Sequence, residues 1–168
     1  RYTNGYDWIW RVDADEIAPE GMVKEMIRQA EIQGLIDGSI SGDFRVPFIH
    51  AWRTFNRACR DSSHPIRLTR FNVGDGCRIL TLDSNGGKWE VWHGGYAQPT
   101  KWIEYKISVS GHRSEWRPDW FKDRWLANAH QDVHPVIWPG HWNSEPYDKE
   151  KLPALMQKHP YWRMEVIE

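Results

Sequence analysis

The chain has 168 residues, of which 22 are basic and 23 acidic, so its formal net charge is −1. This balance argues against a nucleic-acid-coating protein or a polybasic membrane binder, and no run of about 18 apolar residues is present to span a bilayer. Twelve residues are tryptophan, nine of them from Trp89 onward. Because an indole ring suits both core filling and stacking on sugars, we expect a soluble globular protein with an aromatic second half.

The first part of the chain predicts a strand, an acidic turn and a helix. Residues 6–12 are aromatic and β-branched, which indicates a buried strand that runs into the acidic stretch 13–16. Pro19 suits a first helical turn, and apolar residues recur at helical spacing until Gly34 ends the pattern.

The middle of the chain predicts short strands. One covers residues 44–50, where Pro47 indicates an edge or a bulge, and the polar residues 53–64 predict a loop. Further elements follow in chain order: strands over 66–71, 78–82 and 89–92, and a turn over 83–87.

The last part predicts helices and one ordered loop. Pro99 opens a helix that reaches Ser110, and Pro118 opens a second helix with an aromatic apolar stripe. Residues 130–147 are rich in His, Pro, Trp and Gly and predict an ordered loop, after which a short helix begins near Pro153.

Asp13 and Asp15 are the first candidates for chemistry. Alternate residues of an extended chain point to one side, so both carboxylates are expected beyond the strand's carboxyl end, where open α/β sheets bind ligands. Two carboxylates there suit Mg²⁺ or Mn²⁺. The alternative is that these acids, with Glu16, are solvated turn and capping residues ahead of a helix N-terminus.

The motif His93-Gly94-Gly95-Tyr96 is the second candidate. Its glycines allow a tight turn or a close approach to a ligand, and a neutral imidazole can complete a carboxylate metal set. Lys106, thirteen residues after His93, would contact a phosphate or a carboxylate. The alternatives are a hydrogen-bonded turn histidine and a solvated helix face.

The remaining histidines form a looser group. His130, His134 and His141 lie among Trp138 and Trp142 at a spacing that fits no zinc template. We expect a loop held by aromatic packing, with a sugar-stacking surface as the alternative.

The two cysteines are uninformative about function. Cys59 and Cys77 form no CxxC pair and lack the density of a disulfide scaffold. We expect two free thiols in a cytoplasmic protein, with one disulfide as the alternative.

Several segments together resemble a known family. Residues 7–17, Asp-Trp-Ile-Trp-Arg-Val-Asp-Ala-Asp-Glu-Ile, are similar to the strand and Asp-x-Asp segment of bacterial and phage family 2 glycosyltransferases with the GT-A fold. Residues 67–71 resemble the basic-aromatic strand that follows, and residues 93–97 with Lys106 resemble the family's histidine motif and its lysine. Residues 119–125 and the later His134-Pro135 also fit the family's C-terminal region, so the resemblance covers most of the chain.

The resemblance implies an α/β fold with a GT-A-like mixed sheet flanked by helices. The catalytic sheet would occupy residues 1–97, and residues 98–168 would form a helical, aromatic-rich region of the same domain. Family members carry an N-terminal βαβ half that holds the nucleotide base, whereas this sequence begins just before the Asp-x-Asp strand. We therefore expect it to be the C-terminal portion of a larger domain.

The resemblance also implies a reaction: transfer of a sugar from a nucleoside-diphosphate-sugar donor to a hydroxyl of a glycan or other acceptor, with inversion. Asp15 would bind Mn²⁺ or Mg²⁺ directly, and Asp13 would face the nucleotide ribose or the ion's water shell. His93 would be a further metal ligand or a diphosphate contact. The ion would neutralise charge on the departing diphosphate.

An inverting transferase also needs a carboxylate base on the acceptor hydroxyl. Many relatives carry a His-Glu pair ahead of the histidine motif, but residues 79–83 here read Ile-Leu-Thr-Leu-Asp. Asp83 is therefore the first candidate for the base and Glu90 the second. Trp92, Tyr96 and Lys106 complete the expected substrate contacts.

Two other function classes remain open. The tryptophan-rich second half would suit a non-catalytic carbohydrate-binding or assembly module, and the same Asp and His residues would suit a metal-dependent phosphoesterase. None of the three classes requires a nucleic-acid partner or a membrane span.

Overall fold

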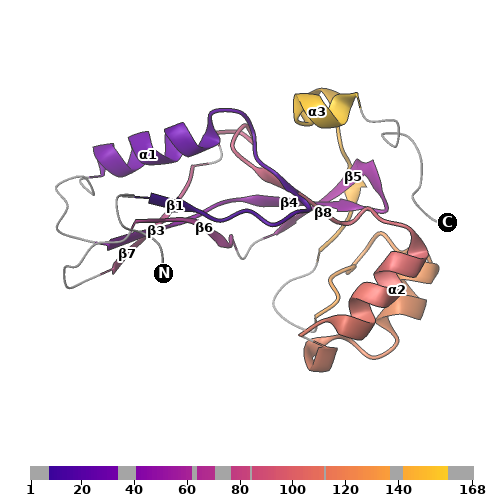
Figure 1. The fold of residues 1–168 in the computed structure, drawn as a ribbon. Helices are drawn as coiled ribbons and strands as arrows, with labels where there is room; N and C mark the ends of the chain where they lie inside the picture. Colours follow the sequence, from indigo (N-terminus) through magenta and orange to yellow (C-terminus); the bar gives the residue numbers. More distant parts are fainter. Residues whose placement is uncertain are drawn as a thin grey trace. The chain divides into compact units, whose positions relative to one another are not determined.

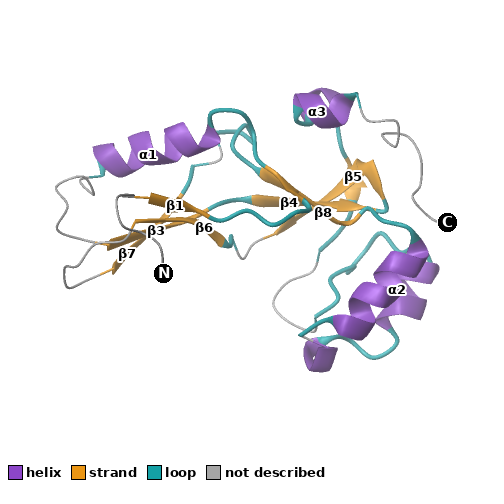
Figure 2. Cartoon of the chain, in the orientation of Figure 1, coloured by secondary structure: helices purple, strands orange, loops and turns teal. Residues whose placement is uncertain are grey.

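The computed structural model describes residues 8–33, 41–61, 64–70, 77–83, 85–111, 113–136 and 142–158, and over these the chain is a mixed α/β protein (Figures 1 and 2). The described strands form two sheets. The chain divides into two compact units that interleave along the sequence. Unit 1 comprises Arg1–Phe48 and Ser63–Val91, and unit 2 comprises Ile49–Ser62 and Trp92–Glu168.

The sheet of unit 1 has the strand order β1-β6-β3-β7. The strands are β1 (Trp8–Trp10), β6 (Ile66–Arg70), β3 (Ser41–Arg45) and β7 (Cys77–Thr81). Both β1 and β3 pair antiparallel with β6, while β3 pairs parallel with β7. The strands predicted over 66–71 and 78–82 are thus confirmed, whereas β1 is half-buried rather than buried.

Helix α1 (Met22–Ile32) covers one face of this sheet (Figure 1). Its buried side chains recur every fourth residue, which is the spacing that places them on one helical face. The Met22 N–H donates to the Pro19 carbonyl at 3.1 Å, so Pro19 precedes the helix instead of forming its first turn. The core of unit 1 is mainly aliphatic and methionine-rich: Met22, Met26, Ala30, Phe44, Val46, Phe48, Leu68, Leu80, Leu82 and Val91.

The strand predicted over residues 44–50 is two strands. Strand β3 ends at Arg45, and β4 (Phe48–Trp52) begins after Pro47. Proline has no N–H to donate to a neighbouring strand, which ends the pairing there. Its carbonyl still accepts the Val91 N–H at 2.9 Å.

The second sheet has the strand order β2-β8-β4-β5-β9. Besides β4, its strands are β2 (Glu16–Ile17), β8 (Val91–Tyr96), β5 (Thr54–Asp61) and β9 (Glu145–Pro146). The loop predicted over residues 53–64 was therefore wrong for most of its length. Polar side chains of β5 make hydrogen bonds within unit 2: Arg57 donates to the hydroxyl and the carbonyl of Ser144.

The helices of unit 2 follow the prediction in position, and one of them differs in type. Helix α2 (Thr100–Val109) begins directly after Pro99, as predicted. The segment predicted to follow Pro118 is a π-helix, η2 (Phe121–Leu126), in which the Ala127 N–H donates to the Lys122 carbonyl five residues back. Three further short helices lie in the described part of the unit: η1 (Arg113–Glu115), η3 (Lys149–Lys151) and α3 (Ala154–Gln157).

Tryptophan dominates the core of unit 2. Trp52 packs edge-to-face against Trp120 and Trp125, with ring centroids 6.0 and 5.4 Å apart. The indole N–H of Trp52 donates to the Ala129 carbonyl at 2.9 Å, and that of Trp120 donates to the Val133 carbonyl at 3.0 Å. Many of the described tryptophans therefore fill the core of the protein. No helix in the described ranges has the length and apolar character needed to cross a bilayer.

Candidate functional site

The predicted acidic loop is a turn closed by its own hydrogen bonds in unit 1. The Glu16 N–H donates to the Asp13 carbonyl at 3.1 Å, and the Asp13 N–H donates to Glu16 Oε2 at 3.2 Å. The Asp13 side chain is 62% exposed, and Asp15 is half-buried. The turn therefore presents the Asp13 carboxylate to solvent directly after β1.

Arg67 of β6 holds this turn in place. Its guanidinium donates two hydrogen bonds to the buried Glu16 carboxylate, and its Nη2 lies 3.3 Å from Asp13 Oδ2. The same guanidinium stacks on the Phe48 ring, 4.8 Å from the centroid. Glu16 is thus a turn residue, as the alternative expected, but it is buried and ion-paired and not solvated.

Asp13 and Asp15 have the chemistry that a divalent cation requires, but among the described residues they do not form part of a group of three ligands. Carboxylate oxygens suit Mg²⁺ or Mn²⁺, which keep several waters and take substrate oxygens as further ligands. Across the described parts of the chain, no group of three His, Cys, Asp or Glu side chains is arranged to hold a metal.

His93 lies on β8 of unit 2, directly above Gly95. These residues are two positions apart, so they lie on the same side of the strand. A Cβ added to Gly95 would lie 2.7 Å from His93 Nε2 and 2.5 Å from Lys106 Nζ. Two nitrogens from different elements therefore converge where only glycine leaves room.

Lys106 reaches this place from α2. Its Nζ donates to the Gly95 carbonyl at 3.3 Å and lies 5.0 Å from the centroid of the Tyr96 ring. The structure thus brings together three of the predicted site residues: His93, Tyr96 and Lys106. We call His93 and Lys106, with Gly95 beneath them, the His93–Lys106 pair.

The charge of this pair favours an anion over a cation. Lys106 carries a positive charge beside the imidazole, and a metal ion on His93 Nε2 would be repelled by it. A phosphate oxygen would instead be attracted to the ammonium and could accept a hydrogen bond from a protonated Nε2. Of the two roles expected for His93, the surroundings favour the diphosphate contact.

Trp92 and Tyr96 are both buried. Trp92 is only 2% exposed and packs edge-to-face on Tyr147, with centroids 4.8 Å apart. Since successive residues of a strand point to opposite faces, Trp92 also faces away from His93. In this structure Trp92 therefore packs in the core, and Tyr96 supports Lys106.

His50 is a member of this site that the sequence prediction missed. It lies on β4, is 6% exposed, and has its Nδ1 2.8 Å from the Nδ1 of His93. Its ring stacks on Trp142 with centroids 4.1 Å apart. The available signal was a single histidine in the otherwise apolar run 46–52.

The two candidate bases lie in unit 1 and differ in exposure. Asp83 follows β7, is exposed, and accepts the Asn85 N–H on Oδ1 at 2.9 Å. Glu90 is only 6% exposed. A carboxylate must reach the acceptor hydroxyl to take its proton, so exposure favours Asp83.

The loop predicted over residues 130–147 is held by packing and hydrogen bonds wherever it is described. His134 Nδ1 lies 3.0 Å from the Val136 carbonyl, and its ring packs edge-to-face on Trp142. His130 Nδ1 lies 3.1 Å from the Ser144 hydroxyl. These contacts support the structural reading, while Trp138 and His141 lie outside the described residues.

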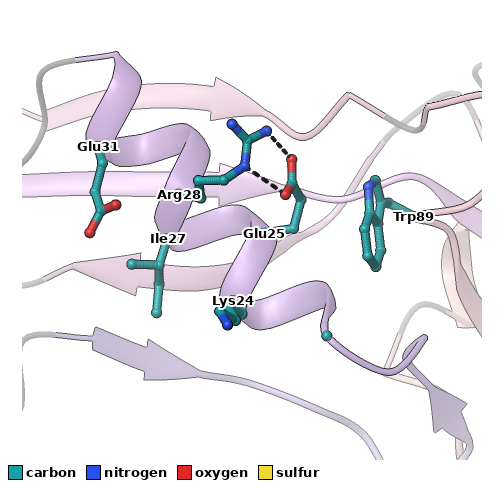
Figure 3. Close-up of a pocket in the computed structure, with 7 residues that line it drawn as sticks. Lys24, Glu25, Ile27, Arg28, Glu31 and Trp89 are labelled. Atoms are coloured by element: carbon teal, nitrogen blue, oxygen red, sulfur yellow. Dashed lines mark hydrogen bonds and ion pairs between the residues drawn. The ribbon is translucent and has the colours of Figure 1, made fainter.

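A shallow groove of about 430 Å³ lies in unit 1 beside α1 (Figure 3). It is lined by Gly21, Lys24, Glu25, Ile27, Arg28, Glu31 and Trp89. Figure 3 shows Arg28 and Glu25 hydrogen-bonded on the helix, with Trp89 beside them on another segment. Hydrogen bonds from Arg28 and then Gln29 lower the pKa of Glu25 to about 2. The groove thus combines an aromatic ring with charged groups.

Comparison with known proteins leaves the family open. The chain matches no protein-family model, and no curated protein or solved structure shows significant similarity to it.

Proposed function

We propose that the chain belongs to a glycosyltransferase that moves a sugar from a nucleoside diphosphate to an acceptor hydroxyl, with inversion and with the help of Mn²⁺ or Mg²⁺. The observation that carries the proposal is the convergence of His93 Nε2 and Lys106 Nζ over Gly95. The histidine motif and its lysine are also part of the resemblance to GT-A family 2 enzymes, together with the Asp-x-Asp segment. The proposal retains the GT-A-like fold and the cytoplasmic location expected from the sequence.

The His93–Lys106 pair would hold the departing diphosphate. In the transfer, the acceptor oxygen forms a bond to the anomeric carbon while the bond from that carbon to the phosphate oxygen breaks. The electron pair of the broken bond goes to the diphosphate. Two fixed donors aimed at that developing charge would lower the barrier, because they need no rearrangement during the step.

Asp83 would accept the proton of the acceptor hydroxyl, which balances the reaction. Its exposure in unit 1 supports this role over Glu90. Asp13 and Asp15 would hold the divalent ion, which would supply Lewis-acid neutralisation of the diphosphate. Glu16 has no part in this assignment, since its carboxylate is bound by Arg67.

Calorimetry with UDP, GDP and TDP, with and without Mn²⁺, tests the proposal, followed by product analysis with the corresponding sugar nucleotides. We expect Lys106→Ala to weaken diphosphate binding about tenfold or more, which is the usual loss for a charge-assisted contact. Lys101→Ala is the matched control, because Lys101 is an exposed lysine of the same helix.

Asp15→Ala should remove the dependence of binding on Mn²⁺ while binding in metal-free buffer persists through the His93–Lys106 pair. Glu31→Ala, which removes an exposed carboxylate of unit 1, should change neither. The proposal fails if no nucleoside diphosphate binds under either condition.

The groove beside α1 favours one alternative, a carbohydrate-binding module that performs no transfer. Trp89 supplies an aromatic surface for a sugar ring, and Lys24 and Glu31 supply polar groups for its hydroxyls. Glycan binding that persists in EDTA, survives Asp13→Ala and is lost in Trp89→Ala would support this module. Binding that requires Mn²⁺ would support the transferase.

A further inference from the structure

The contact between His50 and His93 places a constraint on where protons sit. Their Nδ1 atoms are 2.8 Å apart, which is hydrogen-bond distance. One ring nitrogen must donate and the other must accept, so two neutral rings in this contact must be opposite tautomers. The tautomer of His50 therefore determines the tautomer of His93.

Aromatic packing fixes the ring that makes this contact. His50 stacks on Trp142 with centroids 4.1 Å apart, and it meets His93 edge-to-face at 4.8 Å. The ring centroid of Tyr96 lies 6.3 Å from that of His50. A half-turn of the His50 ring would place a carbon where Nδ1 now meets His93, so the packing and the hydrogen bond support one orientation.

The two possible tautomers give the His93–Lys106 pair different chemistry. If His50 donates, His93 accepts on Nδ1 and carries its proton on Nε2, the atom that converges with Lys106 Nζ over Gly95. The pair then presents two donors, as an anion requires. If His93 donates instead, its Nε2 has a lone pair, which would repel a phosphate oxygen.

We propose that His50 is a positioning residue that donates its Nδ1 proton to His93 and so makes His93 Nε2 a donor to a bound diphosphate. This inference rests on the proposed function for the identity of the anion. It adds a buried residue that touches no substrate atom and acts through the His93 ring.

Long-range ¹H–¹⁵N spectra of histidine-labelled protein read the tautomer directly, and His93→Gln identifies the signals of His93. With pyrophosphate bound in metal-free buffer, we expect a proton on His93 Nε2 and none on its Nδ1. A His93 that is protonated on Nδ1 in this complex, alone or on both nitrogens, overturns the proposal.

Two substitutions of His50 distinguish the effect of its donor proton from the effect of its ring packing. His50→Asn keeps an N–H near the position of Nδ1, whereas His50→Phe keeps a ring against Trp142 and loses the donor. We expect pyrophosphate affinity within about threefold of wild type for His50→Asn and about tenfold weaker for His50→Phe, the usual loss for one hydrogen bond. Equal affinity in the two variants also overturns the proposal.

The readouts keep this inference distinct from the proposed function. If wild-type protein binds no pyrophosphate, the diphosphate site fails, whereas the tautomer of His93 can still be read in the free protein. In that case a donor His50 would still be shown by a proton on His93 Nε2, and the opposite tautomer would exclude it. Circular-dichroism melting of both variants establishes that their binding is compared in folded protein.

Discussion

The two units stabilise themselves with different kinds of core. Unit 1 buries aliphatic and methionine side chains beneath α1 and holds the buried ion pair of Arg67 with Glu16. Unit 2 buries tryptophans whose N–H groups reach specific acceptors, such as the carbonyls of Ala129 and Val133. The described core of unit 1 therefore depends on apolar area together with the Arg67–Glu16 charge pair, and that of unit 2 depends on oriented rings.

The difference matters for the candidate site because the core of each unit orients the candidate residues of that unit. In unit 2, His50 stacks on Trp142 and His93 lies over Gly95, so the same aromatic packing that forms the core also orients the His93–Lys106 pair. In unit 1, the Asp13 carboxylate extends from a turn fixed by Arg67. Substitutions in the two cores should therefore act through different physical terms.

Trp125→Ala is expected to have the largest effect. The ring is fully buried, Arg53 lies 5.0 Å from its centroid, and its Nε1 donates to the Thr100 hydroxyl at 3.3 Å. Truncation of a buried tryptophan usually lowers the free energy of unfolding by about 3–5 kcal/mol. Urea denaturation followed by circular dichroism measures this loss. A loss below about 1 kcal/mol would show that the rings of unit 2 are not essential packing.

Glu16→Gln tests the charge pair of unit 1. It leaves the Arg67 guanidinium, 11% exposed, without its buried counter-charge, and we expect a loss of about 3 kcal/mol in the free energy of unfolding. The double variant Glu16→Leu with Arg67→Met should recover most of that loss, since it removes both charges. Recovery in the same denaturation assay would show that the loss in Glu16→Gln comes from the unpaired Arg67 charge. It would also show that the intact ion pair adds little net stability.

Met26→Leu tests how much the aliphatic core of unit 1 tolerates. Met26 is fully buried, but the substitution conserves volume and breaks no hydrogen bond, so we expect a loss below about 1.5 kcal/mol. Trp120→Phe in unit 2 is the comparison, because it also removes the hydrogen bond to the Val133 carbonyl. A smaller loss for Trp120→Phe than for Met26→Leu would contradict the contrast between the cores.

Cys59 gives the smallest effect and a pH dependence. Burial raises the pKa of its thiol from 9.0 to about 12, so the folded state keeps the proton that the unfolded chain releases. The corresponding stability is fully present below pH 9 and is lost as the pH rises towards 12. At pH 10 the loss should be about 1 kcal/mol relative to neutral pH. Cys59→Ala should show a correspondingly flatter alkaline profile in thermal melts.

The elements that the sequence predicted correctly have local signals. Helix α1 follows from apolar residues at helical spacing, and α2 follows from Pro99 at its start. Strand β5 was missed because its polar residues find partners far along the chain, as Arg57 does at Ser144. The π-helical form of η2 depends on hydrogen bonds that no local pattern encodes.

The candidate site divides in the same way. The motif with His93 and the later lysine could be picked out from the sequence, and a strand and a helix bring them together. His50 could not be assigned to the site from the sequence, because it contacts His93, which lies 43 residues further along the chain. The Asp13 turn was predicted, but its attachment to Arg67 required the fold.

The interleaving of the two units has a consequence for synthesis on the ribosome. The chain passes from one unit to the other after Phe48, Ser62 and Val91, so neither unit is a continuous segment. Unit 1 becomes complete only when Val91 has emerged, and until then strand β4 has its neighbour β5 but lacks its other neighbour β8, which begins at Val91. A nascent chain halted near Val91 would therefore expose Trp52, because its ring partners Trp120 and Trp125 come later in the chain, and a chaperone could cover it during this interval.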